Sequence, residues 1–326
     1  MNRITIALFL LFAALLVGCY EPVSDNGADF EKRRTTEEAV ETPSAPGSET
    51  NAATPLSDEE RTQMNETNKT AAVGFRGNVD RMLAKEGLTI QQVVNESSPV
   101  EKRVFEEYGA IYLTKAKPPS KAMFADDAEV AAFQAAAGIA SENLGGVVLE
   151  LQPAAMEALL AAREEARSKG LSILPRDGAE AGRRTYSKTL ALWKSRFEPA
   201  LRHWKGKGRL SEAEVARLQQ LPIKEQVADV LKLEKQGVYF NTFFNDSILF
   251  SVAAPGTSQH LAMLAFDVTE YSNPRVQEIL ANHGWFRTVQ NDAPHFTYLG
   301  HPQSELPSIG LKKVEKKDGS FWIPDI

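Results

Sequence analysis

The sequence holds only one cysteine, Cys19, among its 326 residues, so no disulfide can form within the chain. It also lacks a basic block: 37 Lys and Arg stand against 43 Asp and Glu, a formal net charge of -6, and we expect no nucleic-acid partner. Neither an internal repeat nor a regular alternation of strands and helices is present, which argues against a doubly wound parallel sheet. Hydrophobic residues nevertheless make up 43% of the chain, enough to bury the core of one or two domains.

The amino terminus has the layout of an export signal. Arg3 precedes an apolar run from Ile4 to Val17, which Gly18 and Cys19 close. About 14 apolar residues form a helix of roughly 21 Å, shorter than the ~30 Å hydrocarbon core, so a permanent membrane span is the weaker interpretation. The sequence LVGC at 16–19 resembles the bacterial lipobox, which implies that residues 1–18 are a lipoprotein signal peptide and that Cys19 is lipidated. The alternative is an incidental thiol in a leader that is removed.

Residues 19–72 are rich in Glu, Thr, Ser, Pro and Asn and have few large apolar side chains. Such a composition cannot bury enough surface to offset the entropy of ordering, so we expect a disordered tether that begins at the lipidated Cys19. The protein is therefore predicted to be exported to the periplasm or cell envelope, with a membrane as its partner through the lipid anchor.

Beyond the tether the composition becomes that of a globular protein. We expect an extension of helices and strands at 73–145, followed by a domain at 146–326 with a helical insertion at about 205–240. Pro153 opens an amphipathic helix that Gly170 ends, and Ser211 with Glu214 forms a capping-box pattern at the start of another helix. Strands are predicted at 108–116, 146–152, 171–175 and 247–252. Because strands and helices mix without βαβ regularity, the predicted fold class is α+β.

Three of the five histidines have structural interpretations. His203 and His301 have no acidic or histidine neighbour at ligand spacing, so we expect solvated structural roles for both. His283 precedes Gly284 at a predicted helix end, where an imidazole suits the carbonyl end of the helix dipole. His260 and His295 therefore remain as the candidates for chemistry.

His260 and His295 each lie near an aspartate. Asp267 ends an alternating strand pattern that begins after His260, and a loop that folds back over this strand would bring the imidazole beside it. Asp292 lies three residues before His295. Two imidazoles and one carboxylate with an open position are the ligand count of a catalytic zinc site, and a second carboxylate can act on the proton of a bound water. A two-histidine iron site has the same count but usually a short His-x-Asp spacing, which is absent here.

Taken alone, these residues leave open that His260 and Asp267 are a loop histidine and a strand-end acid. The pattern, however, resembles the first motif of the VanY-like zinc D-alanyl-D-alanine carboxypeptidases, Ser-x-His-x-x-Gly-x-Ala-x-Asp. Here it reads Ser258, His260, Met263, Ala265 and Asp267, with methionine in place of the glycine. The second motif, DAPHF at 292–296, resembles that of the related L-alanyl-D-glutamate endopeptidases. The resemblance covers roughly residues 146–300.

This resemblance implies a fold and a set of roles. The fold would be a small antiparallel sheet with flanking helices of the Hedgehog and DD-peptidase type, over residues 146–326. His260, Asp267 and His295 would bind Zn2+, and Asp292 would transfer protons.

Two further residues are assigned to the substrate by the same resemblance. Arg184, in the GRRT segment at 182–185, would orient a substrate carboxylate or stabilise the developing oxyanion; the alternative is an ordinary arginine on a helix surface. Ser258 would shape the loop and contact the substrate. Met263 would add a bulky side chain beside the metal and narrow the cleft.

The function predicted from these residues is a zinc-dependent metallopeptidase that hydrolyses peptidoglycan stem peptides as a D-Ala-D-Ala carboxypeptidase. The first alternative is an endopeptidase that cuts L-Ala-D-Glu or a cross-link, which DAPHF favours. The second is a non-catalytic peptidoglycan-binding lipoprotein of the same fold, which Met263 and the helical insertion favour.

Overall fold

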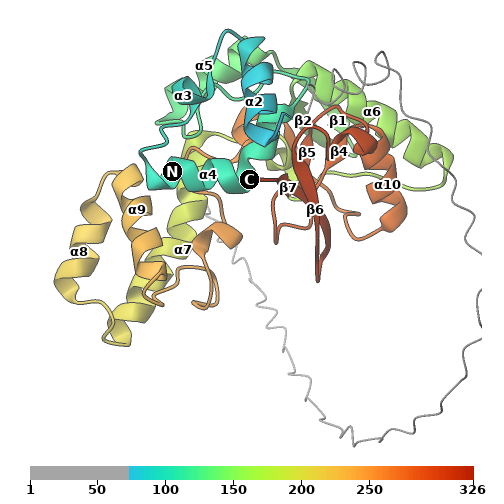
Figure 1. The fold of residues 1–326 in the computed structure, drawn as a ribbon. Helices are drawn as coiled ribbons and strands as arrows, with labels where there is room; N and C mark the ends of the chain where they lie inside the picture. The colour runs from blue at the N-terminus through green and yellow to red at the C-terminus, as the bar shows by residue number, and fades with distance from the viewer. Residues whose placement is uncertain (1–72) are drawn as a thin grey trace, which may run out of the picture. The chain divides into compact units, whose positions relative to one another are not determined.

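The computed structural model describes residues 73–326. The predicted signal peptide, Cys19 and the tether at 19–72 lie outside the described residues, so lipidation and membrane anchoring stay predictions. The described part combines helices with small antiparallel sheets, which is the predicted α+β class (Figure 1). None of its helices has both the length and the apolar character needed to cross a membrane.

In the described part, α2 to α9 precede the strands of the central sheet in the chain, and α10 lies between two of them. In chain order they are α2 (Phe75–Ala84), α3 (Ile90–Val93), α4 (Pro99–Tyr108), α5 (Asp127–Ala137), α6 (Pro153–Ser168), α7 (Tyr186–Gly206), α8 (Glu212–Gln220), α9 (Ile223–Glu234) and α10 (Pro274–Asn282). Short 3-10 turns are η1 (Gly109–Leu113), η2 (Gly178–Ala181), η3 (Ile248–Phe250), η4 (Gln259–Ala262) and η5 (Gln303–Glu305).

Local sequence signals account for several helix ends. Pro153 occupies the first turn of α6, where its missing N–H costs nothing, and the helix stops just before Gly170, whose φ is 68°. Ser211 and Glu214 form the predicted capping box at α8. The α6 and α8 predictions are thus confirmed.

The strands form three separate sheets. They are β1 (Ala140–Leu144), β2 (Val147–Leu151), β3 (Ala265–Asp267), β4 (Trp285–Phe286), β5 (His295–Tyr298), β6 (Leu311–Lys316) and β7 (Gly319–Pro324). β1 pairs with β2 and β6 pairs with β7, while β5 lies between β3 and β4 in the central sheet. All of these pairings are antiparallel.

The register of β3 against β5 separates a buried apolar face from a polar face. Phe266 lies opposite Phe296, and both side chains are buried in the main hydrophobic core. Asp267 lies opposite His295 and therefore projects from the other face with it. The sheet places these two candidate ligands side by side.

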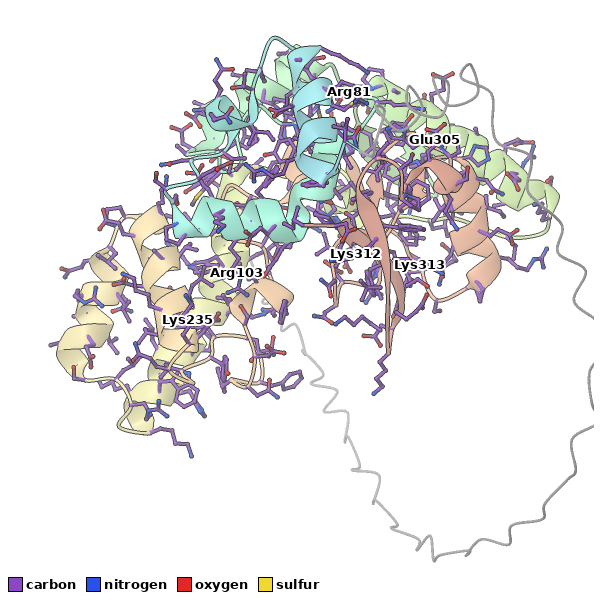
Figure 2. All side chains as sticks on the ribbon, viewed as in Figure 1. Arg81, Arg103, Lys235, Glu305, Lys312 and Lys313 are labelled. Carbon is purple, nitrogen blue, oxygen red and sulfur yellow. The ribbon has the colours of Figure 1, made fainter. Side chains whose placement is uncertain are left out.

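Two hydrophobic clusters fill the described part. The larger one contains residues from both 73–145 and 146–326, such as Phe75 and Leu159. The second lies among α4, α7, α8 and α9, and includes Trp193 and Val230. The predicted insertion at 205–240 contains the end of α7 together with α8 and α9, which group together in Figure 1. Arg103 of α4 reaches toward the segment after α9, where its Nη2 donates to Ser247 Oγ at 3.3 Å (Figure 2).

Three predicted strands are wrong. Residues 108–116 contain the end of α4 and the 3-10 turn η1, and all residues of η1 are buried. A continuous apolar run fits a buried helical turn as well as a buried strand, so its pattern does not separate the two. Residues 247–252 contain the turn η3, and 171–175 contributes only an isolated bridge between Pro175 and Val268. The strand predicted at 146–152 is confirmed as β2.

Candidate metal centre

Three segments carry the candidate ligands to one point. Asp267 is the last residue of β3, His295 is the first residue of β5, and His260 belongs to the turn η4 that precedes β3. Their exposed fractions are 8%, 4% and 1%, respectively, so all three are buried. His260 Nε2 also lies 3.3 Å from Asp267 Oδ1, so the segment with His260 folds back beside the end of β3, as predicted.

The distances among the three ligand atoms fit one metal ion. His260 Nε2 lies 3.1 Å from His295 Nδ1, and Asp267 Oδ1 lies 3.2 Å from His295 Nδ1 and 3.3 Å from His260 Nε2. Tetrahedral zinc with ligand bonds of about 2.0 to 2.1 Å places neighbouring ligand atoms roughly 3.3 Å apart. His260, Asp267 and His295 thus form a cluster that can hold a metal ion.

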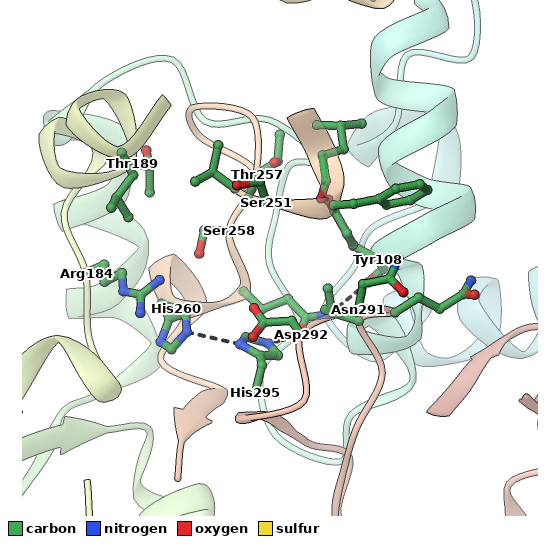
Figure 3. A pocket seen from close by; sticks show the side chains of 18 of the residues that line it. Tyr108, Arg184, Thr189, Ser251, Thr257, Ser258, His260, Asn291, Asp292 and His295 are labelled. Atoms are coloured by element: carbon green, nitrogen blue, oxygen red, sulfur yellow. Dashed lines mark hydrogen bonds between the residues drawn. The ribbon is translucent and has the colours of Figure 1, made fainter. Parts of the chain in front are cut away.

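The other nitrogen of each imidazole determines where its proton lies. His260 Nδ1 is 2.8 Å from the carbonyl oxygen of Gly182, and His295 Nε2 is 2.8 Å from Gln259 Oε1. Since both partners are oxygen acceptors, each of these nitrogens carries the proton of a neutral ring. The nitrogens that face each other across the dashed line in Figure 3 are then both lone-pair acceptors.

Three acceptor atoms that converge without a proton repel one another, and a cation at their centre removes this repulsion. The contacts to Gly182 and Gln259 are those expected around metal-bound imidazoles, because they fix the tautomer and aim the free nitrogen inward. The donor set therefore fits a divalent ion that accepts two nitrogens and one oxygen, as zinc does.

Burial and charge set the protonation states needed for this role. Burial lowers the pKa of His260 to about 4, so the ring is neutral at pH 7. Burial acts to raise the pKa of Asp267, but charge and hydrogen-bond contacts with His260 and His295 outweigh it and hold that pKa well below its ordinary range. Arg184 Nη2 donates to Asp267 Oδ2 at 2.5 Å, which leaves Oδ1 turned toward the ring nitrogens.

A cavity of about 250 Å³ opens at the cluster, and His260, His295, Arg184, Ser258 and Asp292 all line it. Figure 3 shows Asp292 beside the two histidines. Although Asp292 is exposed as a residue, partial burial of its carboxyl raises its pKa, and the charge of Asp267 acts in the same direction.

Of the predicted site residues in the described part, Arg184, Ser258, His260, Asp292 and His295 line this cavity, and Asp267 lies behind them in contact with His295. Arg184 also donates from Nε to the carbonyl oxygen of Glu180 at 2.9 Å, so part of its guanidinium is held by the protein. Among residues 73–326, the Ser258 hydroxyl has no hydrogen-bond partner. The roles assigned to Arg184, Ser258 and Asp292 stay predictions.

Met263 occupies a different place from the one expected. It is fully buried, and the cavity lining does not include it, so its side chain does not narrow the cleft. Its backbone, with φ 55° and ψ 32°, is left-handed, a conformation that glycine adopts more readily than methionine. The methionine therefore affects the backbone of the turn between His260 and β3.

Sequence reasoning missed Gln259 and Arg196. Gln259 stands at a variable position between Ser258 and His260, and nothing in the pattern signals its long-range contact with His295. Arg196 lines the same cavity from α7. The sequence signal for Arg196 is its helical spacing from Thr189 and Leu192, which places all three residues on one face of α7. Thr189 and Leu192 also line the cavity.

The remaining histidines lie apart from the cavity. The prediction of a solvated His301 is wrong, because its ring is buried and its Nε2 contacts the carbonyl oxygen of Leu113 at 2.9 Å. His283 is the C-cap of α10, as predicted, and its Nε2 contacts Glu165 at 2.8 Å.

Neither a protein-family model nor a curated protein sequence matches this chain. Two solved structures resemble it in part, each with 20% identity and a TM-score of 0.29. One is a mutant of the vancomycin resistance D,D-pentapeptidase VanY from a VanB-type resistance cassette in complex with Zn(II), and it matches 51% of this chain and 82% of its own. The other, VanYB in complex with D-Alanine-D-Alanine, matches 50% of this chain and 78% of its own.

Proposed function

We propose that the protein is a zinc-dependent peptidase that hydrolyses peptidoglycan stem peptides, with D-Ala-D-Ala carboxypeptidase as its specific activity. The observation that supports a metallopeptidase most strongly is the convergence of three buried acceptor atoms, 3.1 to 3.3 Å apart, at a cavity that also holds Asp292. Substrate class and scissile bond rest on the resemblance of the two sequence motifs.

The proposed mechanism gives each side chain one task. Bound zinc supplies the Lewis-acid chemistry that activates water and polarises a carbonyl. Asp292 accepts the proton of the attacking water and returns it to the leaving amine, and its raised pKa suits both transfers. Arg184 holds Asp267 in place, while its Nη1, which makes no hydrogen bond within 73–326, orients the terminal carboxylate or the developing oxyanion. The Ser258 hydroxyl contacts the substrate.

The sequence also indicates where in the cell this reaction would take place. The leader at 1–18 and the lipobox cysteine Cys19 favour an exported lipoprotein, and stem peptides belong to a polymer outside the cytoplasm. A membrane anchor would keep the enzyme close to that polymer.

A second candidate is an endopeptidase that cuts L-Ala-D-Glu or a cross-link. It is favoured by the DAPHF motif at 292–296, which places Asp292 at the cavity. The non-catalytic alternative has less support, because Met263, one of the two features that favoured it beside the helical insertion, lies away from the cavity lining.

The test uses the purified mature protein and defined stem pentapeptides. We expect about one zinc per chain by elemental mass spectrometry and release of the terminal D-Ala by product mass spectrometry. Asp292→Asn should retain zinc and lose at least ~100-fold in rate, since general acid–base catalysis contributes roughly 10²- to 10⁴-fold. Cleavage after L-Ala would favour the endopeptidase, and a protein that takes up no zinc after supplementation would overturn the proposal.

A further inference from the structure

The cavity at the metal centre has a second cation, Arg196, which lies on α7. Thr189, Leu192 and Arg196 follow one another at the i, i+3, i+7 spacing of a single helix face, and all three line the cavity. The helix thus extends the cavity wall away from the metal ligands toward Arg196.

Neutral groups hold the guanidinium of Arg196. Its Nε donates to Ser251 Oγ at 2.8 Å and its Nη1 donates to Ser195 Oγ at 2.9 Å. Within residues 73–326, no carboxylate lies close enough to form an ion pair with it, and its Nη2 makes no hydrogen bond. Arg184, by contrast, already forms an ion pair with Asp267 through its Nη2. The charge of Arg196 is therefore available to an anion that enters the cavity.

The geometry of the Arg196 guanidinium indicates that this anion is a carboxylate. A half-buried guanidinium with free N–H groups in a planar fork binds a carboxylate with two parallel hydrogen bonds. Because His260 and His295 line the same cavity, the carboxylate and the scissile amide would belong to one molecule.

The length of α7 limits the distance between this substrate carboxylate and the scissile amide. From Tyr186, which follows the site segment at 182–185, to Arg196 the helix rises about 15 Å. An extended peptide covers roughly 3.5 Å per residue, so this distance corresponds to about four residues, or about two when the arginine side chain reaches back.

We propose that Arg196 is a specificity residue that binds a substrate carboxylate two to four residues from the scissile amide. The proposal rests on the proposed peptidase function and adds a substrate class to it, namely peptides with an acidic residue at that distance. A purely structural alternative is that Arg196 only ties α7 to the loop that carries Ser251.

The test compares peptides that end in D-Ala-D-Ala and differ in one side chain. Each carries Glu or Gln at the second, third or fourth residue before the scissile amide, and kcat and KM are measured for each pair. The wild-type protein should prefer Glu by about tenfold at one position, through a lower KM, as a charged hydrogen bond implies. Arg196→Met should abolish this preference by raising the KM of the Glu peptide to that of its Gln counterpart.

Ser251→Ala is the matched control. It removes the hydroxyl partner of Arg196 Nε but keeps the guanidinium, so the preference for Glu should persist. Arg196→Gln is a second variant in case the methionine variant does not fold, which circular dichroism reports. Equal losses on the Glu and Gln peptides in the arginine variants would assign Arg196 the structural role and overturn the inference, as would a wild type without preference.

Calorimetric Kd values for the same peptides on the zinc-loaded protein separate this inference from the function on which it rests. An Arg196-dependent preference in binding without hydrolysis would support the inference and contradict the peptidase. Hydrolysis without the preference for Glu would support the peptidase and contradict the inference about Arg196. Failure of every peptide to bind would overturn both.

Discussion

Gln259 connects the metal cluster to the protein interior through one amide group. Its Oε1 accepts hydrogen bonds from His295 Nε2 and Thr297 Oγ1, while its Nε2 donates to the carbonyl oxygen of Tyr108 at 3.1 Å. A flipped amide would break all of these contacts, so the orientation is fixed. Gln259 is thus a positioning residue that keeps Nδ1 of His295 unprotonated and directed at the cluster.

Replacement of Gln259 by Leu should lower zinc affinity by about 10- to 100-fold, because His295 loses the acceptor that fixes its tautomer. Competition with a coloured chelator measures the affinity directly. Gln290→Leu is the matched control, since Gln290 lines the same cavity but has no hydrogen bond to a metal-binding residue. The zinc affinity of this variant should equal that of the wild type. Unchanged affinity in Gln259→Leu would rule out the positioning role.

Met263 permits a test of backbone strain, because its φ is 55°. Both Met263→Ala and Met263→Gly remove the buried side chain, but only glycine adopts this conformation without cost. We therefore expect Met263→Gly to be more stable than Met263→Ala by about 1 kcal/mol in urea unfolding.

The matched pair is Met156→Ala and Met156→Gly, at a buried position inside α6. There the order should reverse, with glycine about 1 kcal/mol less stable than alanine. The same order at both positions would contradict a strained turn at Met263.

The turn η3 and the loop around it form one wall of the cavity, and Glu234 at the end of α9 holds them. Its Oε1 accepts from the backbone N–H of Ile248 at 2.7 Å and its Oε2 accepts from Ser247 Oγ at 2.7 Å. Leu249, Phe250 and Ser251 of this segment line the cavity. One buried carboxylate thus links the insertion helices to the site.

Burial raises the pKa of Glu234 above its ordinary value of 4.5, even though hydrogen bonds from Ile248 and Ser247 act to lower it. Between 4.5 and the raised value the folded state binds more protons than the unfolded state, so stability falls as the pH rises through this window. Glu234→Gln removes that loss. The difference in unfolding free energy between wild type and variant should therefore change over this range and become constant above it.

Urea unfolding at a series of pH values measures this difference. Glu225→Gln, at an exposed position in the first turn of α9, is the control and should run parallel to the wild type. A constant difference between wild type and Glu234→Gln across the whole range would refute the assignment.

A bound metal ion would link three segments of the chain, η4, β3 and β5. The main hydrophobic core packs against only one face of β3 and β5. The ligands come from η4, β3 and β5, and the Phe266 and Phe296 side chains behind β3 and β5 pack into the larger cluster. A ligand that binds only the folded state stabilises it by about 2.7 kcal/mol at a hundredfold excess over its Kd.

Removal of zinc by a chelator should accordingly lower the Tm by roughly 5 to 10 °C, given about 2 to 4 °C per kcal/mol for a domain of this size. Differential scanning calorimetry with and without added zinc checks this. His260→Ala should melt at the same temperature in both conditions. A wild-type Tm that is the same with and without added zinc would contradict the metal site.

The sequence determined the features that depend on near neighbours in the chain. The α6 and α8 boundaries follow from Pro153, Gly170, Ser211 and Glu214, whose effects act within one helical turn. The ligand candidates at 260, 267 and 295 followed from residue type and motif spacing. Buried apolar runs such as 108–116 carried no periodicity that separates strand from 3-10 turn, and these predictions failed.

The tertiary structure decided what depends on contacts between distant segments. The β3–β5 register sets Asp267 opposite His295, and the carbonyl oxygen of Gly182, 78 residues before His260, fixes the proton of that imidazole. Arg196 reaches the cavity only because α7 packs along it. Such contacts depend on how the whole core packs, and local spacing in the sequence does not encode that packing directly.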